Sequence, residues 1–182
     1  MNDALFDGSI PTHVGTMTQL EEFFAHRSAF TGPIPSEIGL LQSLKDLRLH
    51  SNKITGTIPD ELYTLGNLET LSLDDMQLSG TISTEVGNLS SLQIIRLGTN
   101  SFVGTVPTEL ASIEPLQLAW FQLNEFNGDI PAAMCSMTTL QFLNADCGPA
   151  DNPAQACPCC TSCCDRSTGI CLRTELATGT RE

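Results

Sequence analysis

Apolar and polar residues alternate in short stretches that return at a fixed interval along the chain. Leu47 and Leu49 are separated by one polar residue, and the same arrangement returns 24 residues later. An alternation with a period of two is typical of a strand that buries one face. The pattern therefore predicts a series of short strands, each with one apolar face.

The whole pattern repeats with a period of 24 residues. Each unit reads L-x-x-L-x-L-x-x-N-x-L-x-G-x-I-P-x-x-L-x-x-L-x-x, with its glycine at Gly8, Gly32, Gly56, Gly80, Gly104 and Gly128. Five complete units span residues 20–43, 44–67, 68–91, 92–115 and 116–139, a partial unit covers 5–19, and a strand-only unit covers 140–147. Such a period predicts a solenoid in which each coil packs only on its neighbours.

Stacked coils place equivalent strands side by side as a parallel sheet, about 4.8 Å apart, along a concave face. We expect Asn52, Asn100 and Asn124 to point inward and to bond to backbone groups of neighbouring turns, because a buried amide is costly without partners. Ser28 and Met76 interrupt this row. We expect a looser turn at Met76, whose side chain cannot replace those bonds.

The repeat, with its L-x-G-x-I-P element, resembles the plant-type leucine-rich repeat of receptor-kinase ectodomains and polygalacturonase-inhibiting proteins over residues 5–147. The resemblance implies an α/β-type solenoid: a right-handed superhelix with a parallel β-sheet on the concave face and short 3-10, irregular and minor β segments on the convex side. It also implies a receptor-like or inhibitor-like recognition module. We divide the chain into a partial N-terminal repeat without an N-terminal cap (1–19), the solenoid (20–147) and a cysteine-rich C-terminal cap and tail (148–182).

Composition narrows the classes of function. The chain is 41% hydrophobic with a formal net charge of −13, so we expect a globular domain that does not bind nucleic acid, whose phosphates need a basic surface. No apolar stretch is long enough for a membrane span, and residues 1–17 lack the basic and apolar regions of a signal peptide. The sequence contains no glycine-rich phosphate loop, nucleophile elbow or HExxH motif, so we expect neither enzyme activity nor a cofactor.

The cysteines are confined to the C-terminal part of the chain, at Cys135, Cys147, Cys157, Cys159, Cys160, Cys163, Cys164 and Cys171. An even number in a short segment predicts a disulfide-linked cap and favours an oxidising compartment. We expect Cys135 and Cys147 to be tied to the tail, and no bond within the vicinal pairs, because such a ring is strained. Metal binding through Cys160-x-x-Cys163 is the alternative. The C-x-CC-x-x-CC cluster is similar to that of microalgal leucine-rich-repeat proteins.

The exposed strand positions vary from coil to coil, whereas the core columns do not. We therefore expect a ligand site on the concave face, the usual recognition surface of solenoids. The candidate ligand-binding residues are Phe24, His26, Arg27, Lys45, Arg48, His50, Ser72, Asp74, Arg96, Trp120, Gln122 and Asn144. Drift is an equally simple explanation, because solvent imposes no pattern either.

Two kinds of chemistry gather on this predicted face. The lysines and arginines before residue 147 all fall on or beside the concave strands, which fits a carboxylate or sulfate ligand unless neighbouring acidic residues pair with them. Trp120 and Phe24 are exposed aromatic anchors for a protein, peptide or acidic glycan. His26, His50 and Asp74 form one column, but a neighbouring arginine opposes a metal cation, so we expect no metal there.

Other positions suggest further properties. Ranks of threonine and serine, at residues 31, 55 and 79 and at residues 57, 81 and 105, resemble the flat faces of ice-binding solenoids, although strand propensity also explains them. Asn88 begins an N-glycosylation sequon, Asn88-Leu89-Ser90. We expect a secreted or cell-surface protein, a fragment of a longer one, with a co-receptor among the expected partner classes and no membrane insertion.

Overall fold

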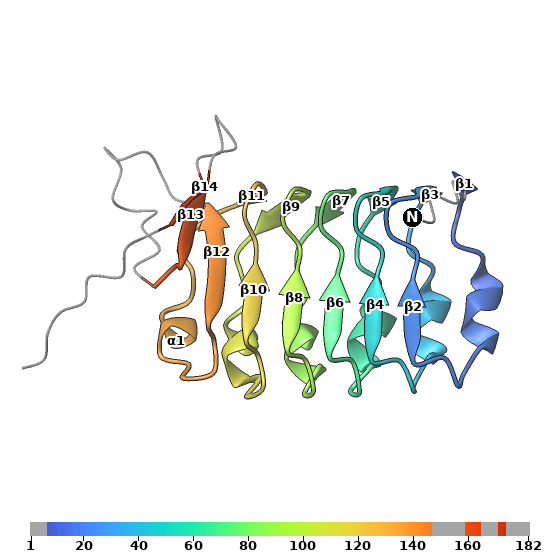
Figure 1. Cartoon of the computed structure of the whole chain (residues 1–182), viewed down its shortest axis with the longest axis horizontal. Helices are drawn as coiled ribbons and strands as arrows, with labels where there is room; N and C mark the ends of the chain where they lie inside the picture. Colours follow the sequence, from blue (N-terminus) through green and yellow to red (C-terminus); the bar gives the residue numbers. More distant parts are fainter. Residues whose placement is uncertain (1–6, 147–158, 165–170, 174–182) are drawn as a thin grey trace, which may run out of the picture.

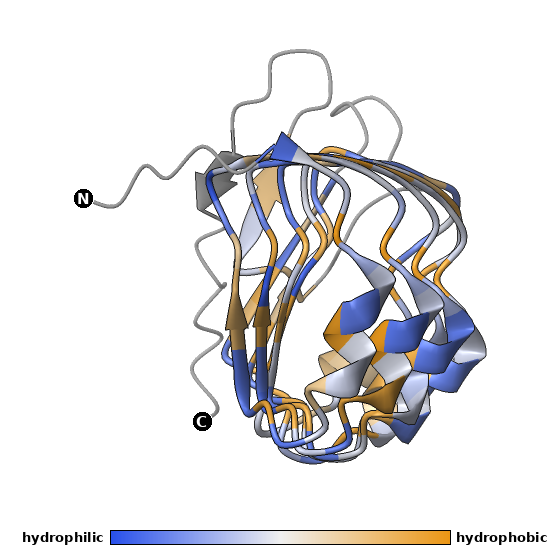
Figure 2. Ribbon diagram, turned by 90° about the vertical axis from the view of Figure 1, so that its right-hand side faces the viewer, coloured by the Kyte–Doolittle hydropathy of each residue, from blue (hydrophilic) through white to orange (hydrophobic). Residues whose placement is uncertain are grey.

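The computed structural model describes residues 7–146, 159–164 and 171–173. The coils stack side by side along one axis, so that equivalent elements form rows (Figure 1). Viewed along the stack, the strands of one sheet lie on one side of a shared interior and the short helices on the other (Figure 2). The predicted solenoid is confirmed.

The concave sheet has eight strands in the order β14-β13-β12-β10-β8-β6-β4-β2. Its strands from the repeats are β2 (Glu22–Phe24), β4 (Asp46–Arg48), β6 (Thr70–Ser72), β8 (Ile94–Arg96), β10 (Leu118–Trp120) and β12 (Phe142–Asp146). These strands pair in parallel and in register, so that Leu47 lies beside Leu71 and Leu71 beside Ile95. All three side chains are 0% exposed, which confirms the predicted inward face.

A second parallel sheet has six strands, β1 (Asp7–Gly8), β3 (Ala29–Gly32), β5 (Lys53–Gly56), β7 (Gln77–Gly80), β9 (Ser101–Gly104) and β11 (Glu125–Phe126). The recurring glycine has positive φ in every coil, for example +80° at Gly80, and it ends every strand of this sheet except β11, which ends two residues before Gly128. A Cβ on Gly80 would also lie 2.8 Å from the γ-methyl of Thr57 in the preceding coil. Gly80 is therefore required by both its conformation and its packing.

The convex side carries one short helix per coil: the 3-10 helices η1 (Thr12–Thr16), η2 (Ser36–Leu40), η3 (Asp60–Thr64), η4 (Thr84–Asn88) and η5 (Thr108–Ser112), and the α-helix α1 (Ala132–Cys135). A proline precedes every one of these helices except η4, and before the 3-10 helices this proline has an extended conformation. There Ser83 takes its place, and its hydroxyl accepts a hydrogen bond from the Glu85 N–H. The exception in the sequence pattern is thus an N-cap.

The predicted asparagine ladder runs through the interior. The Oδ1 of Asn124 accepts from the Phe102 N–H at 3.0 Å, and its Nδ2 donates to the carbonyls of Leu97 at 2.9 Å and Phe121 at 3.0 Å. One side chain thereby joins two coils. Equivalent bonds are made by Asn52 and Asn100.

The expected loosening at Met76 is absent from the described structure. Asp75, the residue before it, has φ of 56°, and the equivalent residue Thr99 in the next coil also has φ of 56°. Met76 is 8% exposed, and its N–H donates to the Thr99 carbonyl at 3.2 Å. Backbone bonds and apolar packing thus hold this turn in the same shape as its neighbours.

The C-terminal cap extends the concave sheet. β13 (Ser162–Cys164) pairs in parallel with β12, and β14 (Cys171–Arg173) pairs antiparallel with β13. A disulfide joins Cys135 to Cys159, as expected for a cysteine of the last coil. Cys160, Cys163 and Cys164 are disulfide-bonded as well, so their thiols are not available as metal ligands. The pairing of Cys147 and Cys157 lies outside the described residues.

We predict that Asn124, a member of the asparagine ladder, contributes more to stability than Met76, which interrupts the ladder. Asn124→Leu should lower the free energy of unfolding by about 3 kcal/mol, because the Phe102 N–H and the Phe121 carbonyl lose their bonds to Asn124 and the Leu97 carbonyl keeps only its bond from Asn100. Met76→Leu at the equivalent position should cost less than about 1.5 kcal/mol, because it keeps volume and removes no hydrogen bond. Urea unfolding followed by circular dichroism measures both, and equal losses would contradict the ladder's role.

Candidate ligand-binding surface on the concave sheet

The concave strands place the candidate residues in two rows. The first row is Phe24, Arg48, Ser72, Arg96, Trp120 and Asn144, on β2, β4, β6, β8, β10 and β12. The second row, two residues further on, contains His26, His50, Asp74 and Gln122. Arg96 and Trp120 are direct register partners, and so are Arg48 and Ser72. The fold therefore gathers these residues on one surface.

Two of the cations on this surface are already paired. Lys45 Nζ lies 2.7 Å from Glu21 Oε2 in the adjacent coil. Arg48 makes a bidentate contact with Asp46, with Nε–Oδ1 at 2.9 Å and Nη2–Oδ2 at 2.7 Å. The hydrogen bond to Asp46 raises the pKa of Arg48. The ion-pair alternative thus holds for Lys45 and Arg48.

Other basic residues behave differently. Arg27 and Arg96 form no ion pair within the part of the chain that the structure describes. Arg27 takes a left-handed conformation with φ of 53°, at the turn that follows β2. Lys53 begins β5 of the second sheet. The prediction that it belongs to the concave surface is therefore wrong. Arg96 is therefore the central unpaired cation of the concave strands.

Both arginines of the first row lie over an aromatic ring. The guanidinium carbon of Arg96 lies 4.4 Å from the ring centroid of Trp120, and that of Arg48 lies 5.1 Å from the centroid of Phe24. A cation at this distance from a ring is attracted by its quadrupole. Trp120 is half-buried, whereas Phe24 is 49% exposed.

The histidine column forms a polar cluster. The rings of His26 and His50 stack with centroids 4.7 Å apart. Ser72 Oγ lies 3.2 Å from His50 Nδ1 and donates to Asp74 Oδ1 at 2.8 Å. The carboxylate thus bonds to the hydroxyl and not to the imidazole, which is not the order of a hydrolase triad. We expected Ser72 to be exposed, but it is 2% exposed because it lies within this cluster.

Burial lowers the pKa of His50. The Asp74 carboxylate opposes this effect, while His26, Arg27 and Arg96 add to it. His50 is therefore biased toward its neutral form, which leaves Arg96 as the positive charge beside it.

A small cavity of about 70 Å³ opens between β4, β6 and β8. Its lining residues are Arg48, His50, Thr70, Ser72, Ile94 and Arg96. Arg96 and the neighbouring N–H groups of Arg48 offer donors suited to an oxyanion at this space. Thr70 and Ile94 were not among the candidate residues. They lie two residues before Ser72 and Arg96 and therefore on the same face of their strands. This spacing could have identified them from the sequence.

Three polar atoms beside this cavity are buried and have no hydrogen-bond partner within the described residues: Arg96 Nε, Trp120 Nε1 and Gln122 Oε1. Gln122 lies against Gly98, where an added Cβ would come within 2.7 Å of its amide nitrogen. The missing side chain at Gly98 thus makes room for Gln122. Asn144, by contrast, accepts a hydrogen bond from Thr161 of the cap at 3.3 Å.

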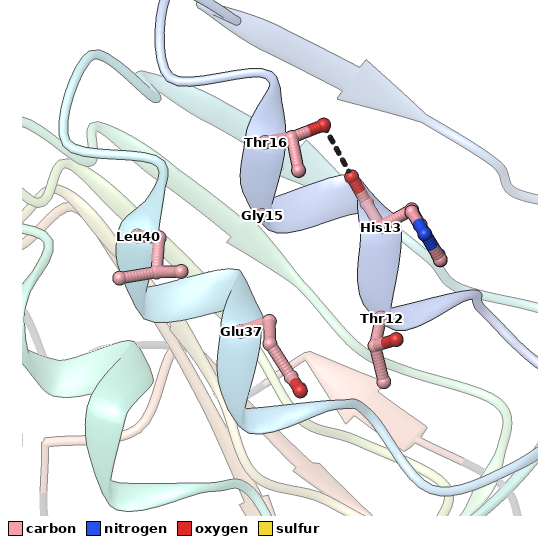
Figure 3. Close-up of a pocket in the computed structure, with 6 residues that line it drawn as sticks. All are labelled: Thr12, His13, Gly15, Thr16, Glu37 and Leu40. Carbon is pink, nitrogen blue, oxygen red and sulfur yellow. Dashed lines mark hydrogen bonds between the residues drawn. The ribbon is translucent and has the colours of Figure 1, made fainter.

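The convex side offers a weaker candidate. A hollow of about 260 Å³ lies between η1 and η2 (Figure 3). It is lined by Thr12, His13, Gly15, Thr16, Glu37 and Leu40. The Thr16 hydroxyl donates to the His13 carbonyl at 2.8 Å and so serves its own helix. The concave cavity is the better candidate because it places the unpaired cation Arg96 beside further hydrogen-bonding groups of Arg48 and His50.

Two expectations about other surfaces stay predictions. Asn88 is exposed at the end of η4, as a glycosylated asparagine must be. The threonine rank has a packing role, because the γ-methyl groups of Thr57 and Thr81 lie against Gly80 and Gly104 of the following coils. No helix in the described part of the chain is long and apolar enough to cross a membrane.

The profile of the Leucine Rich Repeat family matches residues 43–65 and 67–89. The solved structure of the Arabidopsis receptor kinase HAESA, in complex with the peptide hormone IDA and the co-receptor SERK1, is similar with 30% sequence identity and a TM-score of 0.75. The match covers 78% of this chain and 24% of that chain. No curated protein sequence matches the chain.

Two further Arabidopsis ectodomains are similar. That of GASSHO1/SCHENGEN3, in complex with CASPARIAN STRIP INTEGRITY FACTOR 2, has 27% identity and a TM-score of 0.68 over 91% of this chain and 24% of that chain. That of the receptor kinase SOBIR1 has 30% identity and a TM-score of 0.57 over 63% of this chain and 62% of that chain. The chain spans about a quarter of the length of the first receptor structures that it matches.

We predict a pH dependence that originates at His50. Because its folded-state pKa lies below the ordinary 6.5, the unfolded chain binds the proton more tightly. The contribution of His50 to stability is therefore complete above pH 6.5 and decreases as the pH falls through that value. His50→Gln should flatten this part of the stability profile, and Asp74→Asn should lower the His50 pKa further. Proton NMR titration measures the pKa, and a midpoint above 6.5 would contradict the prediction.

Proposed function

We propose that this chain, a leucine-rich-repeat solenoid similar to plant receptor ectodomains, is a recognition module that binds a peptide or protein ligand on its concave sheet. The observation that carries the proposal is the unpaired Arg96 on the half-buried Trp120 ring, beside a small cavity. Arginine and tryptophan are the residues most often found at the energetic centre of interfaces. We propose that the module is not an enzyme.

The similar structures support this proposal. HAESA binds a peptide hormone and a co-receptor, and PEPR1 and RGFR1 were solved with AtPEP1 and RGF2. We propose the same kind of ligand for this chain, with a co-receptor as a second partner. The disulfide between Cys135 and Cys159 supports a place outside the cell, where such bonds persist.

We predict that peptides selected from a random display library on the immobilised protein will bind the concave sheet. Arg96→Ala combined with Trp120→Ala should weaken the selected peptides at least about tenfold, the loss expected when a central anchor of about 1.4 kcal/mol or more is removed. Biolayer interferometry measures the affinities, and circular dichroism checks that the variant folds.

The matched control lies in and next to β5 of the second sheet. Thr57→Ala combined with Lys53→Gln should leave the affinities within about twofold, because neither residue lies on a concave strand. Peptides that lose affinity in this control, and not in the concave variant, would place the ligand surface elsewhere and overturn the proposal.

A further inference from the structure

The concave surface is divided between two kinds of chemistry along the stack. Its first three coils present charged groups, at Glu21, Glu22, Arg27, Lys45, Asp46, Arg48, Glu69, Asp74 and Asp75. On the corresponding positions of β8, β10, β12 and their flanking residues, amides and apolar groups replace them, at Gln93, Ile94, Gln117, Leu118, Trp120, Gln122, Gln141 and Phe142. Arg96 and Asp146 are the charged residues of this second half within the described coils.

Asp146 has a structural role. Its carboxylate accepts from the N–H groups of Leu123 at 2.6 Å and Asn124 at 3.2 Å. Arg96 is therefore the charged group of the second half that is left for a ligand, and it stands at the boundary of the two halves. The cavity that it shares with Arg48 and His50 lies on the charged side of that boundary.

An apolar row occupies the other side. Ile94, Leu118 and Phe142 are direct register partners on three neighbouring strands. Ile94 and Leu118 are half-buried, and Phe142 is 46% exposed, so the described cap residues leave the row open. A row of apolar side chains on a sheet accepts an apolar side chain of a ligand through the hydrophobic effect.

Three polar atoms of Arg96, Trp120 and Gln122 are buried, so a ligand reaches them by displacing Arg96 from the Trp120 ring. Within the described residues, Trp120 Nε1 and Arg96 Nε are donors without a partner, and Gln122 Oε1 is an acceptor without one. A peptide group offers a carbonyl and an N–H within a few ångströms of each other. A polypeptide therefore fits these groups, whereas a hydrocarbon would leave them unpaired.

We propose that the ligand is a peptide segment in polyproline II conformation with a carboxylate three residues away from a large apolar side chain, in either chain direction. The carboxylate lies at the cavity centred on β6, and the apolar side chain lies at β10 against Leu118. Two strand spacings of about 4.8 Å separate these places, and a polyproline II segment advances about 3.1 Å per residue with three residues per turn, so side chains three residues apart point to the same face. This inference rests on the proposed function, since it names the chemistry of the ligand for the same surface.

Trp120 makes a direct test possible, because it is the single tryptophan of the chain. Its fluorescence reports any ligand that displaces Arg96 from its ring. The probes are glycine-serine decapeptides with blocked ends, each with one glutamate and one phenylalanine separated by one, three or six positions, in both orders. We expect the peptides with a separation of three to reach half-saturation at a concentration at least fivefold lower than the others.

Variants assign the two ends of the bound peptide. Arg96→Gln should weaken the peptide with a separation of three about tenfold, and should weaken a glutamine-for-glutamate version of that peptide much less. Phe142→Ser combined with Leu118→Ser should weaken it by a similar factor and should remove the advantage of phenylalanine over alanine. Lys53→Gln, which removes a cation from the second sheet, is the matched control and should change nothing.

The outcomes distinguish this inference from the proposed function. Library peptides that depend on Arg96 and Trp120 but share no spacing of acidic and apolar residues would overturn the inference and leave the proposed function standing. Binding of an acidic oligosaccharide, polygalacturonate, with no binding of either the library or the designed peptides would overturn both. Near-ultraviolet circular dichroism shows whether each variant folds. If Arg96→Gln does not fold, the variant that combines Phe142→Ser with Leu118→Ser still tests the inference.

Discussion

The stacking of each coil on the next in exact register is the constraint on which the structure depends. The backbone of every concave strand between the edge strands β2 and β14 bonds to both neighbours, and the side chain of Asn124 joins two coils through the Phe102 N–H and the Leu97 carbonyl. An insertion within a strand would break these bonds and would turn the apolar face outward. The 24-residue period is therefore a physical requirement, and the outward-facing positions vary more freely than the inward ones.

Prediction succeeded where one physical rule acts at every coil. Burial determines the leucine positions, and the need of buried backbone groups for hydrogen-bond partners determines the asparagine positions. Leu71 and Asn124 were therefore placed correctly from the sequence. It failed where side chains choose among several partners. Ser72 was expected on the surface but is buried between His50 and Asp74, and Lys53 belongs to the second sheet. Periodicity also gives no sign of the strands in the cap, because β13 and β14 lie outside the repeat.

Net charge is a poor guide to this surface. The chain carries a formal charge of −13, yet its concave strands hold a cavity lined by two arginines. The two arginines differ in their intramolecular contacts. Arg48 is paired with Asp46, whereas Arg96 lies over the Trp120 ring and has no acidic partner among the described residues. An acidic protein surface repels anions at long range, so a ligand with a single carboxylate is recognised by local contacts and not by electrostatic steering.

The antiparallel pairing of β14 has a consequence for assembly. A parallel stack of coils resembles a one-dimensional crystal, in which each exposed edge is a template for the next unit. A further coil adds by parallel pairing, together with a second strand and a convex helix. β14 reverses the strand direction, and the disulfide between Cys135 and Cys159 ties the segment before β13 to the last helix. The edge that β14 presents therefore does not repeat the direction in which one coil adds to the next.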